Sequence, residues 1–262
     1  MKITLFTSNN KRHNYLINLL SQISEELFVI QESNNIIPEL MLDRYKSSSI
    51  MKKYFDYVNY AQSQLFSNSD LDIKKKNIKI LPMLSNDLNK CSMSSLSDFL
   101  KSDIYVVFGG AFIKGELVDF LIKKKALNIH AGVSPYYRGT DCNFWALYDG
   151  NPHLVGATIH YLSEGIDSGP IIYHAMSNLK TNPFEYTMST VKSAFHSIAD
   201  RINDGSIFKI KPTNQDKSKE IRYSRKNEFN EKIVEEYFKK EININKKIFD
   251  NSLLKEPFFY NN

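Results

Sequence analysis

The chain has 262 residues, 42% of them hydrophobic, and a formal net charge of +5. This length and composition allow one substantial core with a small appendage and argue against two equal domains. No apolar run approaches the length of a membrane span, and Cys91 and Cys142 lie far apart without metal-ligand spacing, so we expect a cytoplasmic protein with no membrane partner.

The excess of positive charge lies toward the C-terminus. Residues 208–262 hold 13 Lys and Arg against 9 Asp and Glu, and the lysines are interleaved with glutamates, as in residues 235–240. Such interleaving is typical of the solvent-facing side of a helix. We therefore expect no nucleic-acid partner.

The first half of the chain alternates between strand and helix patterns. Short runs of β-branched and apolar residues predict strands at 2–7, 27–30, 78–81 and 104–108. Helices are expected at about 15–20, after the capping cluster at residues 8–10, across 38–66, where apolar and aromatic residues recur at helical spacing, and over 116–125. This order predicts an α/β fold with a Rossmann-like, mostly parallel sheet flanked by helices.

The second half continues this pattern and then changes. We expect a strand around residues 127–130, a helix over 141–148, strands at 155–162 and 171–176, and a helix from 182 to about 203. Residues 206–225 favour irregular or strand-like structure, and 229–240 a final amphipathic helix. We therefore divide the chain into a catalytic domain over 1–205 and a short C-terminal extension over 206–262.

Three polar residues suggest a reaction centre. Asn128 and His130 alternate with apolar neighbours, so a strand would place both side chains on one face. An imidazole can move a proton near neutral pH, and an amide N–H can stabilise an oxyanion. Asp167, between Gly165 and Gly169 on a predicted loop, could orient and charge the imidazole. Each feature alone is more often structural, and their combination is what indicates a site.

The combination resembles the signature of the folate-dependent formyltransferases. In that family an Asn-x-His pair precedes a Pro-x-Tyr-x-Gly type loop, and a catalytic Asp follows in an Asp-(Thr/Ser)-Gly-x-Ile motif. The matching residues here are Asn128, His130, Pro135, Tyr137, Arg138, Gly139, Asp167, Ser168, Gly169, Pro170 and Ile171. The resemblance covers about residues 104–175. Ala131 and Gly132 replace a common Pro-Ser pair and Ser134 a usual Leu, which puts substrate contacts in doubt more than the chemistry.

The resemblance implies roles for further residues. N10-formyltetrahydrofolate would be the co-substrate, with no metal, and Asn128, His130 and Asp167 the catalytic residues. Its pterin would be held by a glycine-containing loop and by part of the Asp167 loop; the residues are Phe108, Gly109, Gly110, Ala111, Phe112, Ile113, Gly165 and Ile166. On the residues alone, the loop at 108–113 also fits a plain tight turn.

Four residues are candidate contacts for a phosphate or a sugar: Asn9, Lys11, Tyr137 and Arg138. Asn9 and Lys11 lie at a predicted helix start, where backbone N–H groups attract anions, although simple capping explains the same position. The remaining His and Cys residues match no standard metal site.

The acceptor is the open part of this prediction. A nucleotide-linked amino sugar, made for a surface polysaccharide such as lipopolysaccharide, fits the size and mild charge. Glycinamide ribonucleotide is the first alternative, and methionyl-tRNA is less favoured because the tail shows too few strand patterns for a barrel. A non-catalytic binding protein with a retained signature and a homodimer are also left open.

Overall fold

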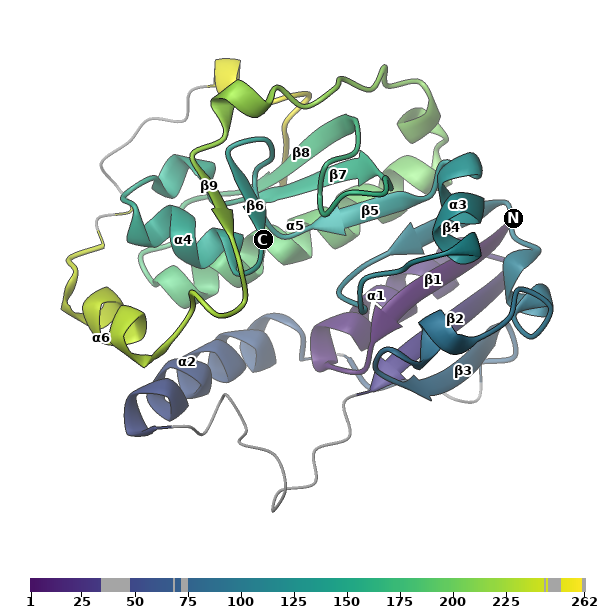
Figure 1. Cartoon of the computed structure of the whole chain (residues 1–262), viewed down its shortest axis with the longest axis horizontal. Coiled ribbons are helices and arrows are strands. Elements are labelled where there is room, and N and C mark those ends of the chain that lie inside the picture. Colours follow the sequence, from purple (N-terminus) through teal and green to yellow (C-terminus); the bar gives the residue numbers. More distant parts are fainter. Residues whose placement is uncertain (34–47, 68, 72–74, 243, 245–250, 261–262) are drawn as a thin grey trace.

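One eight-stranded sheet organises the part of the chain that this computed structural model describes, residues 1–33, 48–67, 69–71, 75–242, 244 and 251–260. Its strand order is β10-β8-β7-β5-β4-β1-β2-β3, and a two-stranded sheet joins β6 to β9 (Figure 1). The strands are β1 (Lys2–Ser8), β2 (Glu26–Ser33), β3 (Ile78–Leu84), β4 (Ile104–Val107), β5 (Leu127–His130), β6 (Tyr137–Gly139), β7 (Ala157–Tyr161), β8 (Ile171–Ser177), β9 (Arg222–Ser224) and β10 (Phe258–Tyr260).

The large sheet is parallel except at one strand. β7 runs antiparallel to both β5 and β8, and the other neighbouring pairs are parallel. β1 lies between β2 and β4, so the strand order reverses there. In α/β sheets ligands bind outside the carboxyl ends of the strands at such a reversal. The predicted Rossmann-like, mostly parallel sheet is confirmed.

Helices pack on both faces of this sheet. The helices of the described residues are α1 (Lys11–Ile23), α2 (Ser49–Leu65), α3 (Glu116–Lys123), α4 (Cys142–Tyr148), α5 (Pro183–Asn203) and α6 (Glu231–Lys239). In β4, Ile104 and Val106 belong to the apolar cluster that contains α1 and α5, whereas Tyr105 and Val107 belong to the cluster with α3. Successive residues of a strand point to opposite faces, so a continuous apolar run requires cover on both sides.

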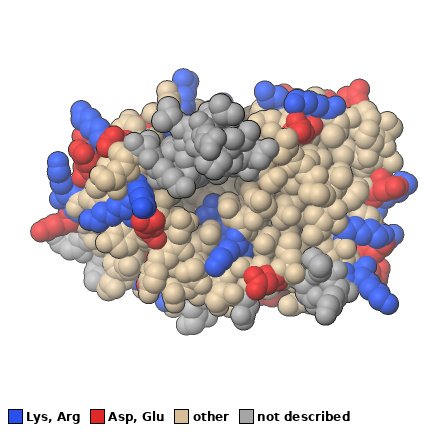
Figure 2. Space-filling model, turned by 90° about the horizontal axis from the view of Figure 1, so that it is seen from below, with Lys and Arg blue, Asp and Glu red and all other residues tan. Residues whose placement is uncertain are grey.

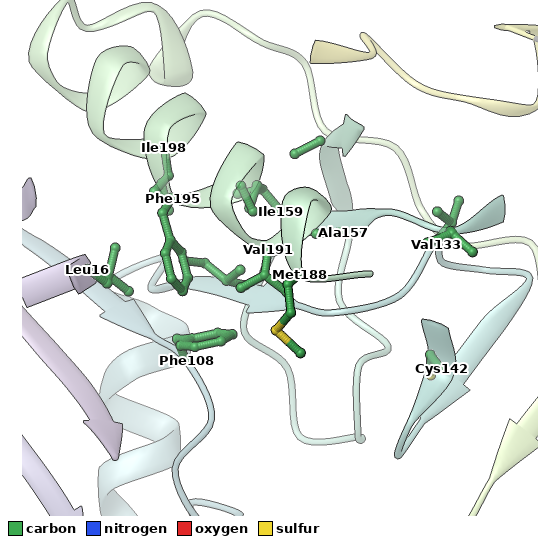
Figure 3. Close-up of a cluster of buried hydrophobic side chains, with 14 of the residues drawn as sticks. Leu16, Phe108, Val133, Cys142, Ala157, Ile159, Met188, Val191, Phe195 and Ile198 are labelled. Carbon is green, nitrogen blue, oxygen red and sulfur yellow. The ribbon is translucent and has the colours of Figure 1, made fainter. Parts of the chain in front are cut away.

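The longest helix, α5, fixes the end of β4. It begins after Asn182, whose side chain accepts hydrogen bonds from the backbone of Phe184 and Glu185. Figure 3 shows Phe195 of α5 pointing toward Phe108, and the two ring centroids are 4.9 Å apart. Phe108, the residue after β4, is thus held by the core just before the loop that follows it.

The predicted elements are found with shifted bounds. The helix expected over 38–66 is α2, and residues 38–47 of that prediction lie outside the described residues. Residues 206–225 form short 3₁₀ turns and then β9. The predicted side-chain capping of α1 is not seen at its N-cap residue, Asn10, which makes no such hydrogen bond. No helix in the described ranges is long and apolar enough to cross a membrane.

The described segments after residue 205 are built into the rest of the fold. β9 pairs with β6, and β10 adds an edge strand next to β8. Phe238 of α6 packs against Tyr54 of α2, with ring centroids 6.4 Å apart. The division at residue 205 stays a prediction, but this small C-terminal addition contacts the sheet at several places.

Candidate active site

The first part of the site lies on two neighbouring strands. Asn128 on β5 is the register partner of His160 on the antiparallel strand β7. Directly opposed residues project to the same face of a sheet, so their side chains meet. The Asn128 Nδ2 atom lies 2.9 Å from His160 Nε2, and His160 is buried.

The loop between β7 and β8 brings the carboxylate to this pair. Asp167 has a φ of 47°, in the left-handed region that Asp tolerates better than most residues. Its Oδ2 atom lies 3.2 Å from His130 Nδ1, and its Oδ1 atom accepts a hydrogen bond from Asn128 Nδ2 at 3.4 Å. The structure therefore brings the three predicted catalytic residues together in one cluster.

The hydrogen-bond partners of His130 indicate its charge. Its Nδ1 faces the Asp167 carboxylate, and its Nε2 lies 3.1 Å from the backbone oxygen of Tyr137. A carboxylate and a carbonyl only accept, so both ring nitrogens must donate, which describes an imidazolium.

The electrostatic balance agrees with this assignment. Burial alone would lower the pKa of His130, but Asp167, assisted by Cys142, outweighs it and raises that pKa well above its ordinary value. Burial alone would raise the pKa of Asp167, but the charge and hydrogen bond of His130 hold it well below its usual range. Both shifts favour the charged forms of the two groups.

His160 also belongs to this cluster, although the sequence did not indicate it as a site residue. Its Nδ1 lies 2.8 Å from the backbone oxygen of Tyr161, which can only accept, so Nδ1 carries the hydrogen. Nε2 is then free to accept from Asn128, and this orients the Asn128 amide with its nitrogen toward Asp167. The partnership depends on the β5–β7 register, which the sequence pattern does not reveal.

The predicted cofactor loop follows β4, the parallel neighbour of β5. Gly109 has a φ of 63°, and a Cβ there would lie 2.6 Å from the ring of His13, so glycine is required. The Ala111 N–H donates to the buried carboxylate of Glu32. Gly110 and Phe112 are exposed. Gly165 and Ile166, predicted for the same ligand, are exposed on the Asp167 loop.

The predicted substrate residues fall into two groups. Asn9 and Lys11 are exposed where β1 passes into α1. The side chain of Tyr137 is buried, and its hydroxyl donates to Asp149 and accepts from Asn151, so the structure directs it into the core. Only the Tyr137 carbonyl reaches the cluster.

Arg138 is also engaged within the protein. Its Nη1 lies 3.0 Å from a carboxylate oxygen of Glu220, and its Nη2 donates to the backbone oxygen of Ile166 at 2.9 Å. The structure thus places Arg138 against the Asp167 loop. Across the described ranges no group of three or more His, Cys, Asp or Glu side chains is arranged to hold a metal ion.

Comparison with known proteins identifies the family. Residues 61–203 match the family described as formyl transferase. The chain belongs to this family. Over 77 residues it is 38% identical to formyltetrahydrofolate deformylase 2, mitochondrial, of Arabidopsis thaliana, a match covering 29% of this chain and 21% of the relative. Over 169 residues it is 27% identical to the methionyl-tRNA formyltransferase of Wigglesworthia glossinidia brevipalpis, covering 61% of this chain and 47% of the relative. The matches thus span about a fifth to a half of these curated formyl transferase relatives.

Solved structures share the formyl transferase fold. A sugar N-formyltransferase from Shewanella sp superposes with a TM-score of 0.54 and 16% identity, covering 87% of this chain and 78% of that one. An N-formyltransferase from Helicobacter canadensis, in complex with folinic acid and dTDP-3-aminofucose, superposes with a TM-score of 0.51 and 13% identity, covering 88% of this chain and 73% of that one. At this identity the likeness is one of fold.

Proposed function

We propose that this protein transfers a formyl group from N10-formyltetrahydrofolate to the primary amine of a nucleotide-linked amino sugar. The observation that carries the proposal is the cluster of Asn128 and His130 around the Asp167 carboxylate. It combines an amide donor with a charged imidazole, as acyl transfer through an oxyanion requires. Membership of the formyl transferase family supports the same reaction.

The proposed step forms one C–N bond and breaks another. The uncharged acceptor amine attacks the formyl carbon, and the carbonyl oxygen becomes an oxyanion that accepts from Asn128 and His130. The C–N10 bond then breaks, the amine loses one proton, and N10 of the departing folate gains one, with His130 handling the transfer. Asp167 remains ionised and holds the imidazolium. Bringing two large substrates together in this geometry supplies on the order of 7–11 kcal/mol in favourable cases.

Both oxyanion donors already have acceptors inside the protein. Asn128 Nδ2 faces His160 Nε2, and His130 Nε2 faces the Tyr137 carbonyl. The oxyanion therefore has to share these donors with their present acceptors or displace those acceptors. The donors themselves are already oriented by the protein. Hydrogen bonds at a catalytic site are often completed only when substrate is bound.

The folate would lie against the two loops predicted for it. Phe112 is 45% exposed and Ile166 is 43% exposed, one on each loop. Large apolar side chains at the surface favour a flat aromatic ligand, and the pterin of folate is one. Gly109 and Gly110 leave backbone groups open to its polar edge.

The start of α1 offers groups that fit an anionic acceptor. Figure 2 shows Lys or Arg side chains inside a recess near the middle of the face seen from below. α1 begins at Lys11 without a side-chain cap, which leaves backbone N–H groups for a phosphate beside Asn9. The ligands named for the Helicobacter canadensis structure, a folate and a nucleotide-linked amino sugar, are of the two kinds proposed here.

Hydrolysis of the formyl donor is the second candidate. The match to a formyltetrahydrofolate deformylase, 38% over 77 residues, favours it. In that reaction water replaces the amine and formate leaves. The same cluster could support it, so the acceptor has to be tested rather than assumed.

The test is a coupled assay with purified protein, N10-formyltetrahydrofolate and a panel of acceptors. The panel holds nucleotide-linked amino sugars, glycinamide ribonucleotide and methionyl-tRNA, and mass spectrometry detects the gain of one formyl group. Formylation of a sugar is expected. Formylation of glycinamide ribonucleotide or of methionyl-tRNA alone would reassign the acceptor, formate release without any amine would indicate hydrolysis, and failure to bind folate would overturn the proposal.

A further inference from the structure

Residues 213–224 form a segment, here called the strap, that is fastened to the rest of the fold at both ends. At one end Thr213 and Ile171 exchange backbone hydrogen bonds of 2.8 Å each. At the other end β9 pairs with β6. Figure 1 shows the chain leaving α5, crossing above β8 and descending into β9. Between these two ends the strap contacts the loop that carries Asp167.

Gln215, near the start of the strap, bonds this loop directly. Its Nε2 atom donates to the backbone oxygen of Asp167 and to that of Gly169, both at 2.8 Å. A side-chain amide nitrogen has two hydrogens, so each carbonyl receives one. Gln215, which lies outside the loop, thus fixes the backbone at Asp167 and at Gly169.

A second contact acts on the preceding residue. Arg138 donates to the backbone oxygen of Ile166 and is itself held by Glu220 of the strap. The carbonyls of Ile166, Asp167 and Gly169 consequently all accept from donors outside the loop. Because Gln215 alone holds two of them, it is the main support.

The loop needs such a support because of its own residues. Asp167 has a φ of 47°, a conformation that a non-glycine residue leaves readily unless its surroundings hold it. Gly165 precedes it and Gly169 follows it, and glycine places few limits on the backbone. A change of φ at Asp167 would turn the carboxylate away from His130.

We propose that Gln215 is a positioning residue for formyl transfer, holding Asp167 in the turn that presents its carboxylate to His130. The expected effect on kcat rests on the proposed function, whereas the expected effect on the Asp167–His130 contact does not. Since Gln215 acts on the backbone of the Asp167 loop, it affects the chemical step more than the binding of the amine.

The kinetic test compares three variants with the unmodified protein. Gln215→Ala removes the amide, Gln215→Met removes it while keeping the side-chain volume, and Asn214→Ala changes the exposed neighbour as a matched control. We expect both Gln215 variants to lower kcat by roughly tenfold to a hundredfold, the scale of a misplaced catalytic group, with little change in KM for the amine. Asn214→Ala should match the unmodified protein.

The second readout needs no substrate. NMR titration of the His130 ring, assigned by its loss in His130→Gln, measures how well Asp167 is placed, because that carboxylate raises the pKa of His130. In both Gln215 variants the pKa of His130 should move toward the value found in Asp167→Asn. Absence of formyl transfer by the unmodified protein would reject the proposed function, yet this titration would still test the strap.

Two outcomes would overturn the proposal. One is an unchanged kcat together with an unchanged pKa of His130 in both variants. The other is a Met variant that behaves like the unmodified protein beside an impaired Ala variant, because volume would then be the cause. Thermal melting checks folding, and if Gln215→Ala does not fold, the Met variant alone decides.

Discussion

The proposed reaction centre and the proposed ligand loops of this molecule are built in different ways. Asn128, His130 and Asp167 satisfy one another through side-chain hydrogen bonds, and His130 and its neighbour His160 are buried. The loop after β4 instead exposes backbone and single apolar side chains such as Phe112. The difference teaches that the proposed catalytic side chains are already oriented by one another, whereas the proposed ligand loops leave backbone and side chains open to solvent.

Removing the carboxylate should have the largest effect. Asp167→Asn keeps the side-chain shape but loses the charge, so formyl transfer should fall by at least about 10²–10³. The variant should fold, and the pKa of His130 should drop. Transfer rates and an NMR titration of His130 measure the two effects, and near-full activity would contradict the proposed cluster.

The same variant should change how stability depends on pH. The pKa of His130 is higher in the folded protein than its unfolded value of about 6.5. Protonated His130 therefore adds to the stability of the fold below about pH 6.5, and this contribution is lost as the pH rises through the folded pKa. The pKa of Asp167 is lower in the folded protein than its unfolded value of about 3.9. Ionised Asp167 therefore adds to the stability of the fold above that pH, and this contribution is lost as the pH falls through the folded pKa. Melting temperatures should therefore decline toward both extremes in the unmodified protein and less so in Asp167→Asn.

Removing the amide donor should rank next. Asn128→Ala should lower turnover by about 10²–10³, the cost of one oxyanion donor, without moving KM for folate. Steady-state kinetics with both substrates would check this. A rise in KM with unchanged kcat would instead make Asn128 a binding residue.

Removing the acceptor that orients the Asn128 amide should lower activity less than removing the amide itself. His160→Phe keeps a ring in the core but removes the acceptor that orients Asn128, and we expect a loss of about tenfold in kcat. The double variant with Asn128→Ala should be no worse than Asn128→Ala alone, because His160 acts through Asn128. Fully additive losses would show an independent role for His160.

Changing the exposed loop should leave the chemistry intact. Gly109→Ala adds a Cβ 2.6 Å from the His13 ring at a φ of 63°, so KM for folate should rise about tenfold with a small change in kcat. Gly150→Ala is the matched control, since its φ is 75° but nothing lies within 4 Å of the added Cβ. Gly150→Ala should lower the stability by about 1–2 kcal/mol, the cost of placing a side chain in the left-handed region, and should leave KM for folate unchanged.

Much of this arrangement could be predicted from the sequence. The strands follow from short apolar runs, and the pairing of Asn128 with His130 follows from their alternation with Leu127 and Ile129. The glycines around Asp167 mark its turn. These features are local, so a pattern a few residues long contains them.

The remaining contacts are not local. His160 meets Asn128 only because β7 runs antiparallel in a particular register. β6 is a three-residue strand whose pleat sends Tyr137 into the core, although its position in the signature suggested a substrate contact. Gln215 lies in a segment without periodicity, and its contact with Asp167 spans 48 positions. No pattern along the chain encodes such pairings.

Backbone oxygens provide many of the acceptors around this site, and this affects what genetics can detect. The carbonyl of Tyr137 faces His130, that of Tyr161 accepts from His160, and that of Asp167 accepts from Gln215. Replacing a side chain at these positions leaves its backbone oxygen in place, so an alanine scan would not report what these carbonyls contribute. Replacing single amide bonds by esters, which makes the preceding carbonyl a weaker acceptor, should reveal their contribution.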